Sequence, residues 1–256
     1  MKKKFQNIID KISPFIIIII ILILWQIMSV IGIIPKFMLP SPLAVVKAFI
    51  KDLPLLMQHT KVTLIEAFLG LGIGIILGFV MAVIMDKYDF AYKSIYPVLV
   101  ITQTVPTVAI APLLVLWLGY GILPKITLIV ITSFFPITVG LLDGFKATDK
   151  DALNLMKTMG ATPFQNFVLL KIPSSMGYFF ASLRISVSYS IIGAVVAEWL
   201  GGFEGLGVYM TRVKKSYSFD KMFAVIFFIS IISLLLMYLV KKIQILSMPW
   251  ENDENK

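Results

Sequence analysis

Long apolar runs alternate with short polar intervals along the chain. Six of these runs are long enough to cross about 30 Å of hydrocarbon, which takes roughly 20 helical residues. They cover residues 14–34, 64–85, 94–118, 124–143, 177–200 and 222–240. The pattern predicts an all-α membrane protein with six transmembrane helices and with both termini on the same side of the membrane.

The longest polar interval, residues 146–173, carries the signals of two short helices. Thr148, followed three residues later by Asp151, has the spacing of a capping box, so we expect a helix from there to Met159. Gly160 suits the left-handed residue just beyond a helix end. The helix would be amphipathic. Its apolar face carries Ala152, Leu155, Met156 and Met159, and its opposite face carries Lys150, Asn154 and Lys157.

The second helix of this interval has its own start and stop signals. Thr162 is a cap, Pro163 suits the first helical position, and Gln165 completes a second capping box. Pro173 is expected to end the helix. Two short helices joined by a glycine fit either a plug that docks on another protein or a loop that rests on the membrane surface. The pattern alone leaves both interpretations open.

Composition and charge agree with a membrane protein. The chain has 256 residues, 59% hydrophobic and 14% charged, with a mean hydropathy of +0.93, and such values are typical of polytopic membrane proteins. Most lysines behind the net charge of +9 flank apolar runs, which indicates topology determinants and argues against nucleic-acid binding. With no cysteine and with His59 as its single histidine, the sequence offers no metal site.

The distribution of basic residues predicts the orientation. Thirteen of the 23 lysines and arginines fall on the side of the termini, nine (Lys125 among them) on the other side, and Arg184 within a span. Lysines at 2–4 and 241–242 place both termini in the cytoplasm. The start of the chain imitates a signal peptide, but its apolar run is long and lacks a small-residue cleavage site, so we expect a retained first span. Loop 144–176 is then cytoplasmic.

The second span and the segment before it carry packing signals. Ser41 and Pro42 cap a helix that we expect to lie flat on the outer surface. In the span itself, Gly70, Gly74 and Gly78 form small-xxx-small pairs that let a neighbouring helix approach closely. Their spacing is not that of a nucleotide-binding loop, and no Walker A sequence occurs in the chain.

Polar residues interrupt the third span. Pro106 offers no N–H to the carbonyl of Thr102, so we expect a kink with a freed carbonyl. Gln103, Thr104 and Thr107, with Pro106, are candidates for a translocation path, because irregular backbone at membrane depth is tolerated where it lines a cavity or is covered by protein. The alternative is a structural kink whose hydroxyls bond to their own helix.

The fifth span carries a polar stripe. Ser188 and Glu198 each lie within about 40° of Arg184 around the helix axis. An arginine facing lipid costs at least about 2.5–3.5 kcal/mol, so the stripe should face the bundle interior or a subunit interface. Arg184 and Glu198 are roughly 21 Å apart along the helix and need separate partners. All three are candidates for the translocation path; Arg184 could equally snorkel or brace the loop, and Glu198 adjoins the glycine-rich turn 201–207 at the outer mouth.

The polar interval resembles the EAA loop of ABC-importer permeases, E-A-A-x-x-x-G-x9-I-x-L-P. Gly160 and Pro173 fall at the glycine and proline of that pattern, and Leu170 and Ile172 replace its isoleucine and leucine. Residues 154–156 read Asn-Leu-Met where the family has Glu-Ala-Ala, so a salt bridge made by that glutamate is not expected here. The resemblance implies an ATPase-coupling loop formed by Asp151, Asn154, Leu155, Met156, Gly160, Ala161, Leu170 and Pro173.

The wider chain, roughly residues 20–242, is similar to the permeases of nitrate, sulfonate, taurine and thiamine-precursor importers. The similarity is carried by the runs 37–42, 103–109, 111–114 and 197–207. Two further runs, Trp117–Lys125 and Gly207–Val213, look most like permeases for pyrimidine precursors of thiamine.

This resemblance implies a single permease domain over residues 1–256, with the type I ABC importer (MetI-like) fold and a coupling-helix loop at 144–176. Its partners would be a second permease copy, identical or not, an extracytoplasmic substrate-binding protein, membrane lipid, and ATPase subunits that bind the ATP and magnesium. The location would be the bacterial inner membrane. The cargo would be a small polar solute, a thiamine pyrimidine precursor, with sulfonate, nitrate or taurine as alternatives.

Two rival classes find little support in the sequence. An intramembrane enzyme would need paired carboxylates, a serine–histidine arrangement or a metal-ligand set, and we find none of these within the spans. An ion-driven secondary carrier would normally show two related halves, and no convincing internal repeat is present. We therefore expect a transport subunit without catalytic residues and without a cofactor of its own.

Overall fold

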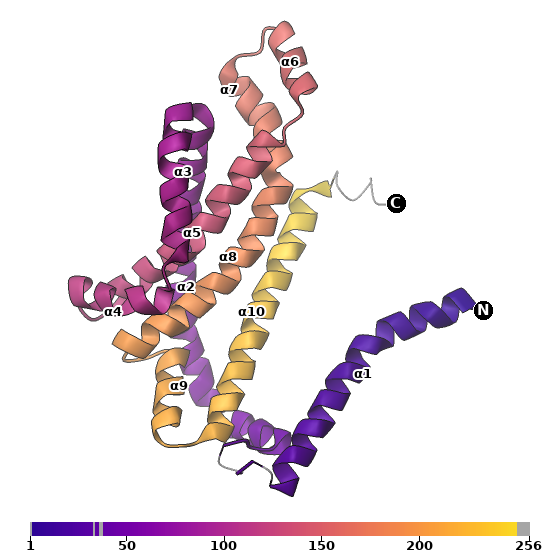
Figure 1. The fold of residues 1–256 in the computed structure, drawn as a ribbon, viewed down its shortest axis with the longest axis vertical. Helices are drawn as coiled ribbons and strands as arrows, with labels where there is room; N and C mark the ends of the chain where they lie inside the picture. The colour runs from indigo at the N-terminus through magenta and orange to yellow at the C-terminus, as the bar shows by residue number, and fades with distance from the viewer. Residues whose placement is uncertain (1, 33, 36–37, 250–256) are drawn as a thin grey trace. The chain divides into compact units, whose positions relative to one another are not determined.

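The computed structural model describes residues 2–32, 34–35 and 38–249, with side chains from residue 16 onwards, and within these ranges every regular element is a helix (Figure 1). The elements are α1 (Lys2–Ile31), α2 (Pro42–Lys87), α3 (Asp89–Thr104), α4 (Thr107–Leu118), α5 (Ile122–Lys146), α6 (Lys150–Thr158), α7 (Pro163–Asn166), the π-helical turn η1 (Phe167–Lys171), α8 (Ile172–Gly201), α9 (Leu206–Lys215) and α10 (Phe219–Ser247). The chain divides into two compact units. The first unit comprises residues 1–58 and 209–228, and the second comprises 59–208 and 229–256.

Four helices among the described residues are long and apolar enough to cross a membrane. They are α2, α5, the continuous helix Pro163–Gly201 that contains α8, and α10. Helices α3 and α4 add a fifth span if the two are taken together. The described apolar part of α1, Ile16–Ile31, is shorter than these. An all-helical protein with several apolar spans is thus confirmed, while the number six stays a prediction.

Two predicted boundaries are wrong. The surface helix after Ser41 and the second span form one helix, α2, because Pro54 removes one hydrogen bond inside it without ending it. The third span is not one kinked helix, because α3 and α4 are bent by 99° relative to each other. Val105 and Pro106 are extended between them. Proline lacks an N–H and disfavours the helical region for the residue before it, so the helix stops here completely.

In the second unit, α2 packs against α5 through the predicted glycine row. A Cβ on Gly74 would lie 2.5 Å from the Ser133 hydroxyl, whereas a Cβ on Gly72, on another face, would meet nothing within 4 Å. A Cβ on Gly70 would lie 2.5 Å from Ile129 of α5, and a Cβ on Gly78 would lie 3.0 Å from Ile137. The predicted close approach of a neighbouring helix is confirmed, and its partner is α5.

Helices α5 and α8 lie side by side along the second unit (Figure 1). Gly140 and Gly144 of α5 face Ser182 and Ser175 of α8 so closely that a Cβ on either glycine would overlap the opposing serine. Large apolar side chains fill the surrounding core, among them Ile137, Leu141, Leu142, Phe145, Phe180 and Val187. The two helices therefore form one tightly packed pair.

The first unit is held together by an aromatic contact and a partly buried carboxylate. The ring of Trp25 packs against Phe223, with 5.7 Å between centroids. The Asp52 carboxylate accepts a hydrogen bond from the Tyr209 hydroxyl at 2.7 Å and pairs with Lys221 at 2.7 Å. Burial raises the pKa of the Tyr209 phenol, and the adjacent Asp52 carboxylate acts in the same direction.

Candidate functional site

The predicted coupling loop is a helical hairpin at one end of the second unit, where α6 and α7 lie beyond the ends of α5 and α8 (Figure 1). Asp149 caps α6, because its carboxylate accepts a hydrogen bond from the Asp151 N–H at 2.8 Å. The predicted cap, Thr148, is instead buried, and its hydroxyl donates back to the Gly144 carbonyl at 3.5 Å. Both residue types are good caps, so the sequence left this boundary ambiguous by one residue.

The glycine elbow is formed as predicted. Gly160 has a φ of 81°, and the N–H groups of Gly160 and Ala161 donate to the carbonyls of Lys157 and Met156, both at 3.0 Å. These two hydrogen bonds are those of a Schellman motif, which closes the helix end with a left-handed residue.

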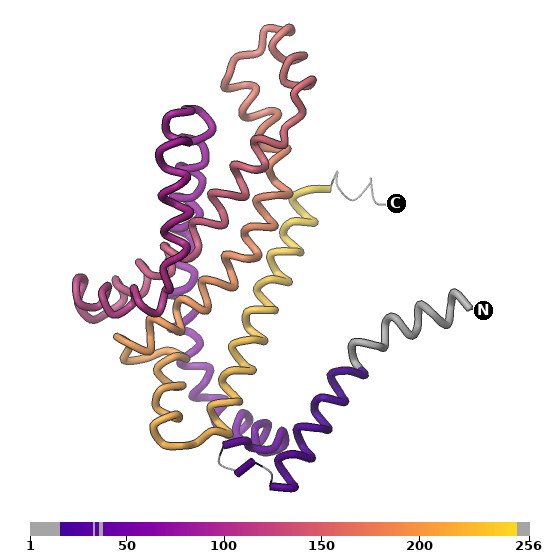
Figure 2. Tube along the Cα trace, in the orientation of Figure 1, coloured from indigo at the N-terminus to yellow at the C-terminus, as the bar shows by residue number. Residues whose placement is uncertain are grey.

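The second predicted helix begins correctly but does not end at Pro173. Thr162 and Gln165 form the predicted capping box, with distances of 2.7 and 3.3 Å. From α7 the chain continues through the π turn Phe167–Lys171 into α8 without a break (Figure 2). Pro173 follows the π turn directly and stands inside this continuous helix without ending it.

Apolar side chains at the tip of the hairpin are exposed. The exposed fractions are 62% for Leu155, 75% for Met159 and 75% for Phe164. The other predicted coupling residues divide into exposed (Asp151, Asn154, Gly160 and Pro173) and half-buried (Met156, Ala161 and Leu170) positions. On the apolar face of α6, Leu155 and Met159 are therefore left uncovered within the described structure, while Ala152 and Met156 are half-buried.

The base of the hairpin is fixed to the helix bundle by a salt bridge. Lys171, in the π turn, contacts both carboxylate oxygens of Asp86, near the end of α2, at 2.7 and 2.8 Å. A cavity of about 770 Å³ lies between this end of α2 and the hairpin, and Asn166 is one of its lining residues. The π turn, a feature frequent at functional sites, thus places the Lys171 ammonium group against a carboxylate of α2.

The candidate path residues around Pro106 lie at the junction of α3 and α4. Gln103 and Thr104 are exposed and Thr107 is half-buried. The hydroxyls of Thr102 and Thr104 donate to carbonyls of their own helix, at 2.7 and 2.8 Å. This self-bonding matches the structural alternative for the two hydroxyls, and a role in a path stays a prediction.

The stripe on α8 has separate partners at its two ends, as expected from its length. The Arg184 guanidinium donates to the side-chain oxygen of Gln244 on α10. Ser188 is half-buried between them. Glu198 is only 1% exposed, and its carboxylate accepts hydrogen bonds from the Thr63 hydroxyl at 2.7 Å and from the Gly207 N–H at 2.6 Å.

Glu198 belongs to a buried polar cluster that sequence reasoning missed. Lys125 of α5 donates to Glu66 of α2 at 2.6 Å, and both side chains are nearly fully buried. The Glu66 and Glu198 carboxyl groups are close enough to interact electrostatically. Lys125 is therefore not a solvated residue of an outer loop, and the expectation that the spans bring no carboxylates together is wrong. His59 joins the cluster by accepting the Gly205 N–H at 3.0 Å.

One signal in the sequence could have revealed part of this cluster. His59, Thr63 and Glu66 follow the i, i+4, i+7 spacing of a single helix face, although the first two precede the predicted span. Their partners on α5 and α8 are distant in sequence and carry no local signal. Among the described residues, no three histidine, aspartate or glutamate side chains are arranged to hold a metal ion.

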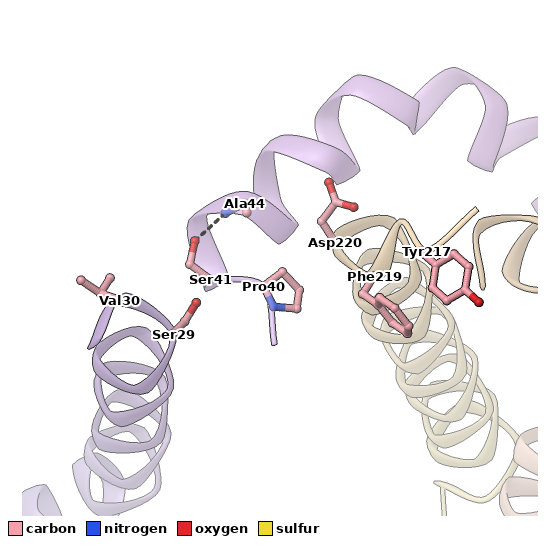
Figure 3. Close-up of a pocket in the computed structure, with 8 residues that line it drawn as sticks. All are labelled: Ser29, Val30, Pro40, Ser41, Ala44, Tyr217, Phe219 and Asp220. Atoms are coloured by element: carbon pink, nitrogen blue, oxygen red, sulfur yellow. Dashed lines mark hydrogen bonds between the residues drawn. The ribbon is translucent and has the colours of Figure 1, made fainter. Parts of the chain in front are cut away.

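A smaller cavity of about 360 Å³ lies within the first unit, lined by residues that include Ser29, Ser41, Tyr217 and Asp220 (Figure 3). Two hydroxyls that line it already have hydrogen-bond partners within the chain. Ser29 donates to the Leu39 carbonyl, and Ser41 caps α2 by accepting the Ala44 N–H. None of the residues predicted for the path lines this cavity, so it gives no support to a path there.

Comparisons with known proteins agree with this arrangement. Residues 74–244 match the family model described as "Binding-protein-dependent transport system inner membrane component". The formylaminopyrimidine transport permease protein ThiX of Halalkalibacterium halodurans is 36% identical over 99% of this chain and 100% of its own length. The aliphatic sulfonates transport permease protein SsuC of Bacillus subtilis is 25% identical over 91% of this chain and 85% of its own length.

A solved structure supports the fold. A chain of the MetNI methionine ABC transporter, in an inward-facing conformation, superimposes with a TM-score of 0.66 over 76% of this chain and 96% of its own length. The sequences are 17% identical, so this likeness concerns the fold alone. On the family model and the ThiX similarity together, the chain belongs to the family of binding-protein-dependent transport system inner membrane components, the permeases of ABC importers.

Proposed function

We propose that this permease carries a pyrimidine precursor of thiamine into the cytoplasm, in a complex with ATPase subunits that dock on residues 144–176. In this proposal two permease chains form the pathway, an extracytoplasmic protein delivers the cargo, and six spans place both termini in the cytoplasm. The observation that carries the cargo assignment is the 36% identity to ThiX along the full length of both chains, against 25% for the sulfonate permease SsuC.

The exposed tip of the hairpin supports the docking site. Leu155, Met159 and Phe164 project from α6 and α7 with most of their surface exposed. Burying a side chain of this size contributes roughly 1.5–3 kcal/mol, so three of them suit a protein interface. Asn154, on the opposite face of α6, stands where the family has a glutamate, so the contact would rest on apolar packing more than on a salt bridge.

The base of the hairpin supports transmission of movement into the bundle. The loop continues through the π turn into α8, and Lys171 joins the same turn to α2. Displacement of α6 by closing ATPase subunits would therefore act on α2 and α8 together. In this mechanism the hairpin works as a lever and the chain itself performs no covalent chemistry.

Reconstitution tests the proposed function. The permease is purified with its ATPase and receptor proteins, placed in liposomes, and assayed for ATP-dependent uptake of radiolabelled formylaminopyrimidine, taurine, nitrate and an alkanesulfonate. We expect uptake of the pyrimidine alone. Uptake of one of the other solutes would overturn the cargo assignment, and uptake driven by an ion gradient without ATP would overturn the importer mechanism.

The chain is suited to a direct test of orientation, because it contains no cysteine. A single cysteine introduced as Leu155→Cys should react with a membrane-impermeant maleimide in inside-out vesicles and not in intact cells. The reverse result would place the hairpin outside the cell and remove the docking site.

A further inference from the structure

Three consecutive backbone N–H groups at the start of α9 are bound by side chains from other helices. Gly205 donates to His59 Nδ1 at 3.0 Å, Leu206 to Thr63 Oγ1 at 2.9 Å, and Gly207 to Glu198 Oε2 at 2.6 Å. The first N–H groups of a helix have no partner within it. Here α2 and α8 supply the acceptors, and all six residues are buried.

The turn and Glu198 fit each other closely. A Cβ on Gly205 would overlap the Glu198 carboxylate, and a Cβ on Gly207 would overlap the Val195 carbonyl. Gly205 also has a φ of 123°, which favours glycine. The backbone of residues 205–207 can therefore approach the buried Glu198 carboxylate only because Gly205 and Gly207 carry no side chain.

A buried ion pair, Lys125–Glu66, lies near the Glu198 carboxylate. Thr63, which bonds both Glu198 and the Leu206 N–H, lies one helical turn from Glu66 on α2, and Glu66 is paired with Lys125 of α5. Four segments of the second unit thus meet here: α2, α5, α8 and residues 202–208, which we name the α8–α9 turn. Breaking one member of such a network leaves buried polar groups without partners, which gives the network a well-defined closed state.

This network lies at the end of α8 opposite the coupling loop. Helix α8 has 30 residues, so its two ends are separated by about 45 Å. At one end the exposed apolar hairpin faces the proposed ATPase, and at the other the turn is pinned by buried hydrogen bonds.

We propose that Glu198, Thr63 and His59 are positioning residues that lock the α8–α9 turn, and that this lock closes the outer end of the pathway until ATPase movement, transmitted through α8, releases it. The inference rests on the proposed function for its topology and for the source of the movement. The lock itself is a property of the resting chain and can be tested without knowledge of the cargo.

The test uses a single cysteine as a reporter in the otherwise cysteine-free chain. Val208, buried next to the lock, is replaced in Val208→Cys, and exposed Glu204 in the matched control Glu204→Cys. The rate of modification by a polar maleimide is measured for the purified, assembled transporter. We expect slow modification at 208 and rapid modification at 204.

Two pairs of substitutions then separate hydrogen bonding from packing. Thr63→Val keeps the side-chain shape but removes the hydroxyl, and Thr63→Ser restores it. Glu198→Ala removes both acceptor oxygens, and Glu198→Gln retains an acceptor. Loss of buried hydrogen bonds should raise modification at 208 about tenfold in Thr63→Val and Glu198→Ala, while Thr63→Ser and Glu198→Gln should stay near the parent rate.

The outcomes are decisive for the lock. An unchanged rate at 208 in Thr63→Val and Glu198→Ala overturns it, and so does an equal rise at 204, which would show general loosening. In the transporter without substitutions in the lock, ATP should raise modification at 208. If uptake proceeds normally and ATP leaves that rate unchanged, the turn does not open during transport and the gating role is wrong, although the proposed function stands.

Discussion

The left-handed conformation of Gly160 makes the coupling loop sensitive to one substitution. Because a Cβ at Gly160 would meet no atom within 4 Å, a larger residue there acts through the backbone and not through a clash. A left-handed conformation costs an L-residue roughly 1–2 kcal/mol, and asparagine tolerates it better than most. Gly160→Val should therefore lower the equilibrium constant for the left-handed elbow conformation, relative to other conformations, by about 5- to 30-fold. Gly160→Asn should retain the elbow.

Coupling is measured in liposomes as cargo molecules transported per ATP hydrolysed. For Gly160→Val we expect normal membrane insertion and continued ATP hydrolysis, with at least about a fivefold fall in transport per ATP. Gly160→Asn is the matched control, since it also adds a side chain at the elbow, and it should stay near the parent ratio. A parent-like ratio in Gly160→Val would refute the lever, because the hairpin would then transmit movement without its observed geometry.

Further predictions follow from other contacts. Lys125→Met leaves the Glu66 carboxylate buried without its cation and should destabilise the protein by about 3–5 kcal/mol, seen as a lower thermal midpoint in detergent; adding Glu66→Gln should recover much of the loss, and no recovery would contradict the pairing. Gly74→Leu should reduce the yield of monodisperse protein, because α5 lies against this position, while Gly72→Leu should not; equal yields would contradict the packing. Arg184→Leu removes the hydrogen bond to α10 and should lower uptake or assembly, and an unchanged value in both assays would show that this contact is dispensable.

Features encoded in one stretch of sequence could be predicted. The glycine row of α2 is predictable as a packing surface because its period of four residues is a local property. The elbow at Gly160 is predictable because only a few residue types favour a left-handed helix end. The sequence predicts the cap of α6 one residue too early, because Thr148 and Asp149 are both good capping residues. The choice of Asp149 depends on α5, since Thr148 is turned back onto that helix.

Features that depend on partners distant in sequence could not be predicted. Pro106 predicted an interruption, but the 99° angle between α3 and α4 follows from packing that no local pattern encodes. The pattern of basic residues assigns Lys125, the second residue of the predicted span 124–143, to the outer side of the membrane. Its partner Glu66 is on another helix, and only the fold brings the two together.

The packing of α5 against α8 links the two ends of the second unit physically. The glycines of α5 bring its backbone directly against serines of α8, and packing this close leaves little room for side-chain rearrangement to absorb a displacement at the hairpin. Lys125 is at the start of α5 and Lys146 at its end, so α5 also runs from the buried cluster to the hairpin. A lever formed by α5 and α8 together would therefore act on the Lys125–Glu66 pair and on Glu198 at the same time. The lock takes Glu198 from α8 and His59 and Thr63 from α2, and the adjacent Lys125–Glu66 pair joins α2 to α5. Movement of α5 and α8 together would therefore strain the contacts of both helices with α2 at once.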